Sequence, residues 1–584
     1  MAASRIHRFS LYFIIFCALL LAAPLSWFVL SGRNAVLHFV TLHVQRPYLD
    51  TILQSTILSE SRYRWLRLFS LLLMAMIAMV ATFLYRYRRY AFMAVFFAVR
   101  SVNGACRSFA RVFVRSKRWE NGVFVFLMVI LAARGIYYIT VTDLQYDEMW
   151  CYNYYTSRPV YLTLFSYANY SLYELATHFF KWLPFSIKVD LRLPSLISGL
   201  FACTLIYGCV KRLSGSFLTA TATVVFFAST PLITNDMLYG KGMIEEIFFA
   251  IVSFFCLVFY LRKVRGAGWL FLYIISSVSG FYAMPTHVYY WFVQGVVSGF
   301  LIIGFKKNAF KPFFAVNGWV IVLVLACYLP IMIGSGMSPV VNAARGYDEN
   351  YFPSTLLTAY LRDFSLYLSG GSYGMILVFV LAAVAMVIDS KKRVVYLSLL
   401  VFSMFLFLLP IPIRYFQRIE VPARALGFGV LGIPVAAYII FDFLQRKTIP
   451  FVRSTIVSAG FLTMCMISHF HSFRTWSARS DRQAPVIANI LMAHEVHTCY
   501  DNSQPSHFYY YYPALEFYFA NRNRSIDLFI NDPKSLRYRI FKPIDRYDCI
   551  IQHAPGSGES IGQGYYSVYT DLEEGFSIFI RNGK

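Results

Sequence analysis

Long apolar runs recur from near the start of the chain to about residue 470, and short polar segments separate them. Each run is close to the roughly 20 residues that an α-helix needs to cross the hydrocarbon core of a bilayer. Lipid cannot satisfy open backbone groups, so such runs form helices. The pattern predicts a polytopic α-helical membrane protein with about thirteen transmembrane helices, at residues 9–30, 65–84, 122–141, 191–210, 215–233, 245–261, 268–284, 287–305, 313–333, 373–389, 394–410, 425–444 and 453–470.

The composition agrees with this pattern. Hydrophobic residues make up 58% of the 584 residues and charged residues only 14%. A soluble domain carries about 25% charged residues. The composition therefore excludes a soluble globular protein.

The excess of basic residues is confined to one side of the membrane. The net charge of +24 comes from 53 Lys and Arg against 29 Asp and Glu. With a cytoplasmic N-terminus, the cytoplasmic segments hold 25 of the basic residues and no acidic ones, and the rest of the chain holds 28 basic and 29 acidic residues. The charge thus follows the positive-inside rule and needs no nucleic acid to explain it. The cytoplasmic segments are 1–8, 85–118, 211–212, 262–265, 306–311, 391–393 and 446–453.

One of these segments has helical periodicity. Arg107, Arg111 and Arg115 recur every four residues with apolar residues between them. This pattern is typical of a basic helix on an anionic lipid surface. A topology anchor with no further role remains an equal alternative.

The segment that follows the third span carries the strongest candidate chemistry. Asp143, Asp147 and Glu148 come directly after a membrane helix, and an aromatic band that includes Tyr146, Trp150 and Tyr152 surrounds the acidic pair. Ionisable groups near lipid are costly, so they tend to mark a substrate path or a reaction centre. The pattern predicts a catalytic site here, with aromatic faces on which a sugar ring can stack.

The next polar stretch predicts an interfacial helix at about residues 160–183. Tyr170, Glu174 and His178 are four residues apart and share one helical face. Glu174 and His178 could together hold a metal ion. The alternative is that they form the wet face of a surface helix.

Two further outer turns bring charged groups to the same side of the membrane. Asp236 and Lys241 lie in the first turn, and His287 lies in the next. Glu245 and Glu246 in the first turn are explained by the preference for acids at a helix N-terminus. Asp236 has no such explanation and is a catalytic candidate. His287 is a candidate for substrate binding, and a structural role is the alternative.

Outer arginines run against the overall charge pattern. Arg345 lies in a loop at 334–372 that is long enough to serve as a lid. Arg414, Arg418 and Arg424 follow a later span. Bidentate binding of a phosphate would account for them, and pairing with outer carboxylates is the alternative.

The apolar runs end near residue 470, and short alternating strands follow at about 526–530, 548–552 and 576–580. We therefore divide the chain into N-terminal anchor helices with a basic cytoplasmic segment (1–120), a transmembrane catalytic core (121–470) and a small extracytoplasmic α/β domain (471–584). A disulfide between Cys499 and Cys549 is one possibility on that side of the membrane.

These motifs resemble a known superfamily. Asp147-Glu148 after a membrane helix, Asn169 to Leu175, Asp190 to Ser195 and Thr286-His287 are similar to the bacterial GT-C glycosyltransferases. Within that superfamily the chain resembles the protein O-mannosyltransferase-like family, which includes the lipid A aminoarabinose transferases. The similarity covers about residues 120–310.

The resemblance implies a polyprenyl-phosphate-linked sugar donor, inverting transfer outside the membrane and an external acceptor hydroxyl on a glycolipid, a polysaccharide or a protein. It implies Asp147 as the general base and Asp236 as a second acidic motif. The sequence has Tyr170-Ser171 and Trp150 where the aminoarabinose branch has Lys-Pro and Arg. These differences argue against aminoarabinose as the sugar.

The residues fit this chemistry on their own. A hydroxyl is a poor nucleophile until a positioned carboxylate accepts its proton, which is the role expected for Asp147. The leaving phosphate needs charge stabilisation, which Lys241 and the outer arginines would provide, and a divalent cation is a further candidate. We expect a multi-pass plasma (inner) membrane enzyme with an extracytoplasmic site. The alternatives are a transporter or flippase for a lipid-linked or anionic substrate, and a non-catalytic scaffold.

Overall fold

The computed structural model of the protein describes most of the predicted helices and strands. The described residues are 19, 22–23, 25–44, 59–86, 88–165, 170–262, 268–305, 310–335, 362, 364–366, 368, 374–409, 412, 423–446, 479–501, 511–524, 526–530, 547–553, 564–571 and 576–582. The chain forms two compact units, one of Arg100–Ala478 and one of Met1–Val99 together with Arg479–Lys584.

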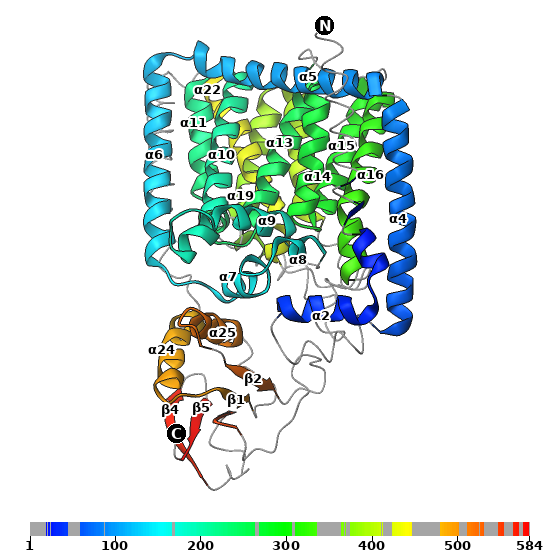
Figure 1. The fold of residues 1–584 in the computed structure, drawn as a ribbon. Coiled ribbons are helices and arrows are strands. Elements are labelled where there is room, and N and C mark those ends of the chain that lie inside the picture. The colour runs from blue at the N-terminus through cyan, green and yellow to red at the C-terminus, as the bar shows by residue number, and fades with distance from the viewer. Residues whose placement is uncertain are drawn as a thin grey trace. The chain divides into compact units, whose positions relative to one another are not determined.

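The larger unit is a bundle of apolar helices (Figure 1). The helices pack because each buries an apolar stripe against its neighbours, and α10, α13 and α22 are the most enclosed of those long enough to cross a membrane. The bundle consists of α6 (Arg118–Val141), α10 (Ile187–Ser214), α11 (Phe217–Ala228), α13 (Met243–Leu261), α14 (Gly268–Ala283), α15 (His287–Phe305), α16 (Phe310–Ser335), α19 (Gly374–Ile388), α20 (Arg393–Leu408), the 3₁₀ segment η5 (Ala423–Leu431) and α22 (Gly432–Arg446).

The prediction of a polytopic membrane protein is confirmed. Five helical stretches of the described chain are long and apolar enough to cross a membrane, at Arg118–Val141, Ile187–Ser214, Met243–Leu261, Phe310–Met332 and Leu426–Arg446. Shorter apolar helices occupy other predicted spans, among them Phe217–Ala228, Gly268–Ala283 and Arg393–Leu408. The total of thirteen stays a prediction, because the span at 453–470 and most of the span at 9–30 lie outside the described residues.

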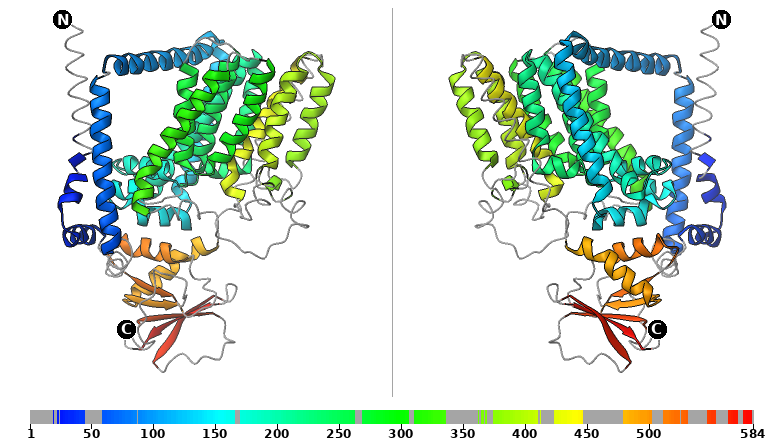
Figure 2. Two further views of the ribbon diagram at one scale, coloured as in Figure 1. Left: turned by 90° about the vertical axis from the view of Figure 1, so that its right-hand side faces the viewer. Right: turned by 90° about the vertical axis from the view of Figure 1, so that its left-hand side faces the viewer.

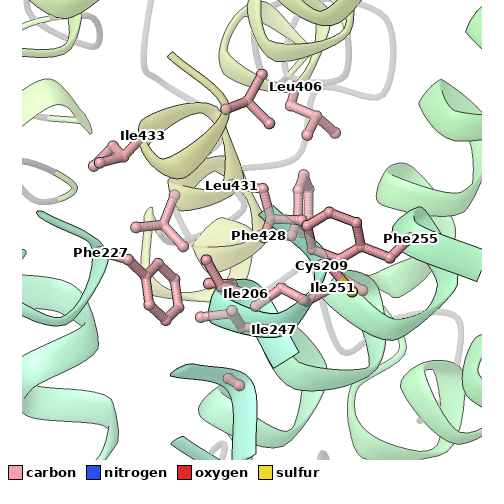
Figure 3. Close-up of a cluster of buried hydrophobic side chains, with 14 of the residues drawn as sticks. Ile206, Cys209, Phe227, Ile247, Ile251, Phe255, Leu406, Phe428, Leu431 and Ile433 are labelled. Atoms are coloured by element: carbon pink, nitrogen blue, oxygen red, sulfur yellow. The ribbon is translucent and has the colours of Figure 1, made fainter. Parts of the chain in front are cut away.

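The core of the bundle is a continuous set of buried hydrophobic side chains. Figure 3 shows its centre, where Phe227 of α11 and Phe255 of α13 lie among aliphatic side chains of neighbouring helices. Burial of this apolar surface within the protein gives the helices dense contacts that lipid tails alone would not supply. The labelled members are Ile206, Cys209, Phe227, Ile247, Ile251, Phe255, Leu406, Phe428, Leu431 and Ile433.

A helix crosses one end of this bundle. In α5 (Arg88–Arg115), the part within the larger unit packs across α10: Ser108 accepts hydrogen bonds of 2.9 and 3.1 Å from Arg212, and the Phe113 ring lies 5.7 Å from that of Tyr207. Phe109 contacts Gly208 so closely that a Cβ on Gly208 would lie 2.4 Å from its ring. The predicted helix with Arg107, Arg111 and Arg115 is therefore confirmed, and these three side chains are exposed.

We call this the basic end of the bundle, because Lys and Arg gather here. The described acidic side chains at this end are Glu120, Asp389 and Asp442, and each is paired with a cation. The printed pairs are Lys211–Glu120 at 2.6 Å, Lys392–Asp442 at 2.8 Å, Arg446–Asp442 at 2.9 Å and Arg446–Asp389 at 2.8 Å. The pairs join α6 to α10, and α19 and α20 to α22.

Short helices connect the spans at the opposite end of the bundle (Figure 1). They are α7 (Tyr146–Cys151), the π-helical turn η2 (Tyr152–Thr156), α8 (Val160–Phe165), α9 (Ser171–Phe180) and α12 (Pro231–Asp236). The predicted interfacial helix at 160–183 is thus observed as α8 and α9. The predicted lid at 334–372 lies almost wholly outside the described residues.

The second unit contains N-terminal helices and a C-terminal sheet. Helix α2 (Arg33–Val44) contacts α4 (Glu60–Arg86), which covers the predicted span at 65–84, through Val36 and Tyr63. The sheet has the order β2-β1-β3-β5-β4. Strand β1 (Thr498–Asp501) is parallel to β2 (Asp527–Ile530) and β3 (Cys549–His553), and β5 (Phe576–Arg581) is antiparallel to β3 and β4 (Tyr565–Asp571).

Two helices accompany the sheet. Helix α24 (Arg479–Ala493) packs against α25 (Tyr512–Ala520), and both views in Figure 2 show them together beside the strands. The Asp548 carboxylate accepts backbone hydrogen bonds from His497 at 2.9 Å and Thr498 at 3.0 Å, which fixes the start of β1. The three predicted strands are confirmed as β2, β3 and β5.

The sheet brings the two predicted disulfide partners together. Cys499 of β1 and Cys549 of β3 are in register, both are buried, and their sulfurs lie 3.0 Å apart as thiols. Neighbouring strands lie about 4.8 Å apart, which is within the Cα separation that a disulfide spans.

We expect Cys499 and Cys549 to be disulfide-bonded in protein isolated from cells, because an extracytoplasmic domain matures in an oxidising compartment. Alkylation of the denatured protein with a polyethylene-glycol maleimide measures this. Reduction should add two adducts to the wild type and none to Cys499→Ser. If reduction adds no adducts to the wild type, both thiols are already reduced and the domain lies in a reducing compartment.

Candidate functional site

The acidic pair lies at the start of a short helix. Helix α6 ends at Val141, and α7 begins four residues later at Tyr146. The Glu148 carboxylate accepts a hydrogen bond from the Gln145 backbone N–H at 2.8 Å, which closes the first turn of α7. Asp147 and Glu148 are therefore adjacent in the chain but point to different partners.

Glu148 is fully buried and forms a two-point ion pair with Arg192 of α10. Arg192 Nε and Nη2 donate to the two Glu148 carboxylate oxygens at 2.6 Å each, and both side chains are almost inaccessible to solvent. Paired geometry of this kind compensates much of the cost of burying the two charges. The neighbouring chain segments are arranged around the Glu148–Arg192 pair.

Arg192 also closes the end of α6. Its guanidinium donates to the Thr142 hydroxyl at 2.7 Å, to the Thr142 carbonyl at 3.0 Å and to the Asp143 carbonyl at 2.7 Å. These carbonyls follow the end of a helix and have no partner within it. One arginine thus fixes the end of α6 and the start of α7 together.

The same carboxylate holds the turn that carries Lys241. The Gly240 backbone N–H donates to Glu148 Oε1 at 2.8 Å. A Cβ at Gly240 would lie 2.5 Å from the Tyr173 hydroxyl and 2.9 Å from the Leu191 carbonyl, so only glycine fits this close approach. Gly242, with φ of 73°, then turns the chain into α13.

Asp147, Lys241 and Tyr239 form a charged group that is in part accessible to solvent. Lys241 Nζ forms an ion pair with the Asp147 carboxylate, and the Tyr239 hydroxyl donates to the same carboxylate at 3.3 Å. The Lys241 side chain is 3% exposed, whereas that of Asp147 is 25% exposed. A carboxylate that can accept a proton is therefore held in reach of solvent, beside an ammonium group and a phenol.

The three predicted aromatic residues lie next to this group along α7 and η2. Tyr146, Trp150 and Tyr152 are half-buried. The Trp150 ring lies 5.3 Å from the rings of Tyr154 and Tyr155. Ring faces of this kind are available to stack on a sugar, and burial raises the pKa of the Tyr152 phenol.

Glu174 and His178 of α9 make separate contacts. Glu174 is buried and accepts a hydrogen bond from Thr156 at 3.4 Å, and His178 lies 3.0 Å from the Thr163 hydroxyl. Burial raises the pKa of Glu174 to about 8 and lowers the pKa of His178.

These contacts show whether Glu174 and His178 are suited to hold a metal ion. A carboxyl group that burial keeps protonated is a weak ligand until it loses its proton. Among the described residues, no three His, Cys, Asp or Glu side chains are close enough to hold an ion together. The described side chains do not offer a metal site at Glu174 and His178, and we route no chemical step through a metal.

Asp236 and His287 belong to a second buried group with Glu245 and Glu246. Glu245 accepts a hydrogen bond from Ser195 at 3.0 Å, and His287 Nδ1 lies 3.7 Å from Glu246 Oε1. Burial, and then the charge of Glu245, raise the pKa of Asp236 well above its ordinary value. Burial thus favours the protonated form of the Asp236 carboxyl group, which can donate a hydrogen bond.

The remaining predicted site residues are four arginines. Arg345, Arg414 and Arg418 are outside the described residues. Arg424 is the second residue of the 3₁₀ segment η5, and its side chain is likewise not described. Their proposed binding of phosphate stays a prediction.

Sequence reasoning missed two residues that the structure places in the site. Arg192 was recognised only as part of a motif, although an arginine in the second turn of a spanning helix is costly unless it is paired, which was the available signal. Tyr239 is two residues before Lys241 and gave no signal of its own.

The fold of the chain is similar to that of a known protein. A solved structure with this fold is that of ArnT from Cupriavidus metallidurans, bound to undecaprenyl phosphate; the TM-score is 0.55 and the sequence identity 10%, over 78% of this chain and 97% of that chain. At this identity the likeness establishes the fold. No protein-family model matches the sequence, and no curated protein sequence matches it.

We expect Glu148→Gln and Arg192→Gln each to lower the free energy of unfolding by about 3–5 kcal/mol, because each leaves a buried charge without its partner. Thermal unfolding of the purified protein in detergent measures this. Lys188→Gln is the matched control, since Lys188 pairs with Asp143 at 2.7 Å on a partly exposed surface. Its loss should stay within about 1 kcal/mol. Equal losses in all three variants would contradict a framework role for the buried pair.

Proposed function

We propose that this protein is a membrane glycosyltransferase that moves a sugar from a polyprenyl-phosphate-linked donor to an acceptor hydroxyl, with inversion at the anomeric carbon. The acceptor is a glycolipid, a polysaccharide or a protein outside the cytoplasm. The observation that carries this proposal is a solvent-reachable carboxylate, Asp147, held beside Lys241 and Tyr239 at one end of a GT-C-like bundle.

The lipid part of the donor follows from two facts. ArnT, which has the same fold, is bound to undecaprenyl phosphate. A polyprenyl chain stays in the bilayer, so the phosphate and sugar of such a donor would lie at the membrane surface. The short helices α7, α8 and α9 connect spans at the bundle end where that surface is expected.

The reaction needs a base and a site for the leaving phosphate. Asp147 would accept the proton of the acceptor hydroxyl while its oxygen attacks the anomeric carbon and the bond from that carbon to the phosphate oxygen breaks. The products are the glycosylated acceptor and the polyprenyl phosphate. Lys241 and Tyr239 would stabilise the negative charge that develops on the phosphate.

The ion pair suggests how the donor would prepare the base. In the absence of donor, Lys241 neutralises Asp147. A phosphate close to Lys241 competes for the same ammonium group, and the Asp147 carboxylate then becomes a stronger proton acceptor. Glu148 does not take part in this exchange, because Arg192, Gln145 and Gly240 already occupy both of its oxygens.

The distribution of charge supports one orientation of the protein in the membrane. The end that carries α5, Lys211, Arg212 and Arg446 would face the cytoplasm by the positive-inside rule. The site and the C-terminal domain would then be extracytoplasmic, in the inner membrane of the cell. The proposal also includes binding of the donor phosphate by outer arginines, namely Arg345, Arg414, Arg418 and Arg424. A divalent cation is a further candidate for this role.

We expect Asp147→Asn to reduce sugar transfer by about 10²–10⁴-fold, because it removes the base and leaves the fold intact. Purified protein is incubated with radiolabelled polyprenyl-phosphate sugars and a membrane extract, and label in the acceptor is measured. Asp143→Asn is the matched control, since Asp143 is a half-exposed carboxylate four residues away. Undiminished transfer by Asp147→Asn would remove Asp147 as the base. Donor movement across vesicles without bond cleavage would favour a flippase.

We expect Lys241→Met to lower kcat/KM by about 10²–10³-fold, because the charge that stabilises the leaving phosphate is lost. Both KM for the donor and kcat should change, since the ammonium group contacts the phosphate before and during the reaction. Lys188→Met provides the control for loss of one outer cation. An unchanged KM for the donor would show that Lys241 only positions Asp147.

A further inference from the structure

A cavity of about 350 Å³ lies between α10, α13, α15, α20 and α22 near the basic end of the bundle. Its volume is within the range of small-molecule sites in proteins. Its walls are almost wholly apolar, and Ile206, Ile251, Phe255 and Leu431 from the core in Figure 3 form the inner side. None of the residues predicted to act on the sugar lines it.

The cavity is reachable from the lipid side. Val394 and Val395 of α20 line it, and both are among the exposed large hydrophobic side chains of the bundle. Apolar side chains exposed on a spanning helix face lipid tails. An acyl chain can therefore enter the cavity beside α20.

Two polar groups stand among these apolar walls. Arg262, the residue that ends α13, is exposed and has no acidic partner among the described residues. Tyr438 of α22 is 5% exposed, and its hydroxyl has no hydrogen-bond partner in the described part of the chain. Arg262 and Tyr438 line the same cavity.

The described acidic groups nearby already have cationic partners. Asp442 lies one turn beyond Tyr438 on α22 and pairs with Lys392 at 2.8 Å and with Arg446 at 2.9 Å. Arg446 also pairs with Asp389 at 2.8 Å. Among the described residues that line the cavity, Arg262 is the cation available to a ligand, and the buried Tyr438 hydroxyl can donate a hydrogen bond beside it.

We propose that this cavity binds an anionic phospholipid of the leaflet at the basic end, with an acyl chain between α15, α20 and α22 and its phosphate on Arg262 and the Tyr438 hydroxyl. A phosphodiester accepts hydrogen bonds from both groups and matches the arginine charge. The apolar walls match the acyl chain. The site is separate from the one proposed for sugar transfer.

A second cavity has no charged lining residue and serves as a comparison for the first. It has a volume of about 520 Å³, lies between α15 and α20, and is lined only by apolar residues such as Val293, Val297, Met404 and Leu408. It offers nothing to a phosphate. Selectivity for an anionic headgroup is therefore expected only at the cavity that Arg262 borders.

Native mass spectrometry of the purified full-length protein, titrated with phosphatidylglycerol or phosphatidylcholine, tests this inference. We expect phosphatidylglycerol to bind more tightly, and Arg262→Gln to weaken that binding about tenfold or more, because a charge-assisted hydrogen bond is lost. Tyr438→Phe should weaken it less. Phosphatidylcholine binding should change little in either variant.

Two further variants separate the cavity from general surface charge. Ser398→Leu fills the cavity from α20, where the serine hydroxyl bonds only to its own helix at 2.8 Å, and should weaken binding with Arg262 intact. Arg107→Gln removes an exposed cation of α5 at the same end of the bundle and should leave binding unchanged. Thermal unfolding in lipid-free detergent verifies that each variant is folded.

The binding measurements on these variants distinguish a specific lipid site from general attraction by surface charge. Equal weakening by Arg262→Gln and Arg107→Gln would overturn the inference, because the attraction would then be general. Competition by inorganic phosphate with no effect of Ser398→Leu would also overturn it, because the acyl chain would then lie elsewhere. Loss of phosphatidylglycerol binding in Arg262→Gln and Ser398→Leu alone would support it.

Discussion

The site depends on the buried ion pair between Glu148 and Arg192. A charge inside a membrane protein is tolerated only with a partner and further hydrogen bonds, and this pair has both. Arg192 binds the end of α6, and Glu148 binds the start of α7 and the turn before α13. Two side chains thus hold four segments of the chain in one arrangement. Asp147 and Lys241 meet because their neighbours are fixed in this way.

This arrangement separates two kinds of acidic residue. Glu148 has its charge fully compensated and belongs to the framework, whereas Asp147 is 25% exposed beside a cation that a phosphate can attract. Asp236, Glu245, Glu246 and His287 form a further buried group in which hydrogen-bonding atoms lack partners in the described chain. Burial favours the neutral form of such carboxyl groups. Acids at the same end of the bundle are therefore suited to different tasks.

The two ends of the bundle differ in their electrostatics. At the basic end the buried acids are neutralised by Lys211, Lys392 and Arg446, so that the excess of positive charge is exposed on α5 and around the helix ends. At the opposite end Asp147 pairs with Lys241 and Glu148 with Arg192, whereas Asp236, Glu245 and Glu246 are buried without a lysine or arginine partner in the described chain. The described charges are thus arranged differently at the two ends.

The sequence by itself determined the class of protein, the positions of the described spans and the segment that carries the acidic pair. It could do so because the length and hydropathy of a run decide whether it crosses a bilayer, and this information is local. The strands β2, β3 and β5 were also foreseen from local alternation, whereas the Cys499–Cys549 pair was only one possibility until the sheet placed the two residues in register.

Only the tertiary structure decided which charges are partners. Glu148 and Arg192 are 44 residues apart, and Glu148 and Gly240 are 92 apart, so no local pattern links them. Adjacent residues such as Asp147 and Glu148 look equivalent in the sequence, yet the helical turn of α7 points one to Lys241 and the other to Arg192. The cavity beside Arg262 is likewise formed by five helices that meet only in the folded bundle. Such pairings depend on packing between distant segments, which the order of residues along the chain does not express.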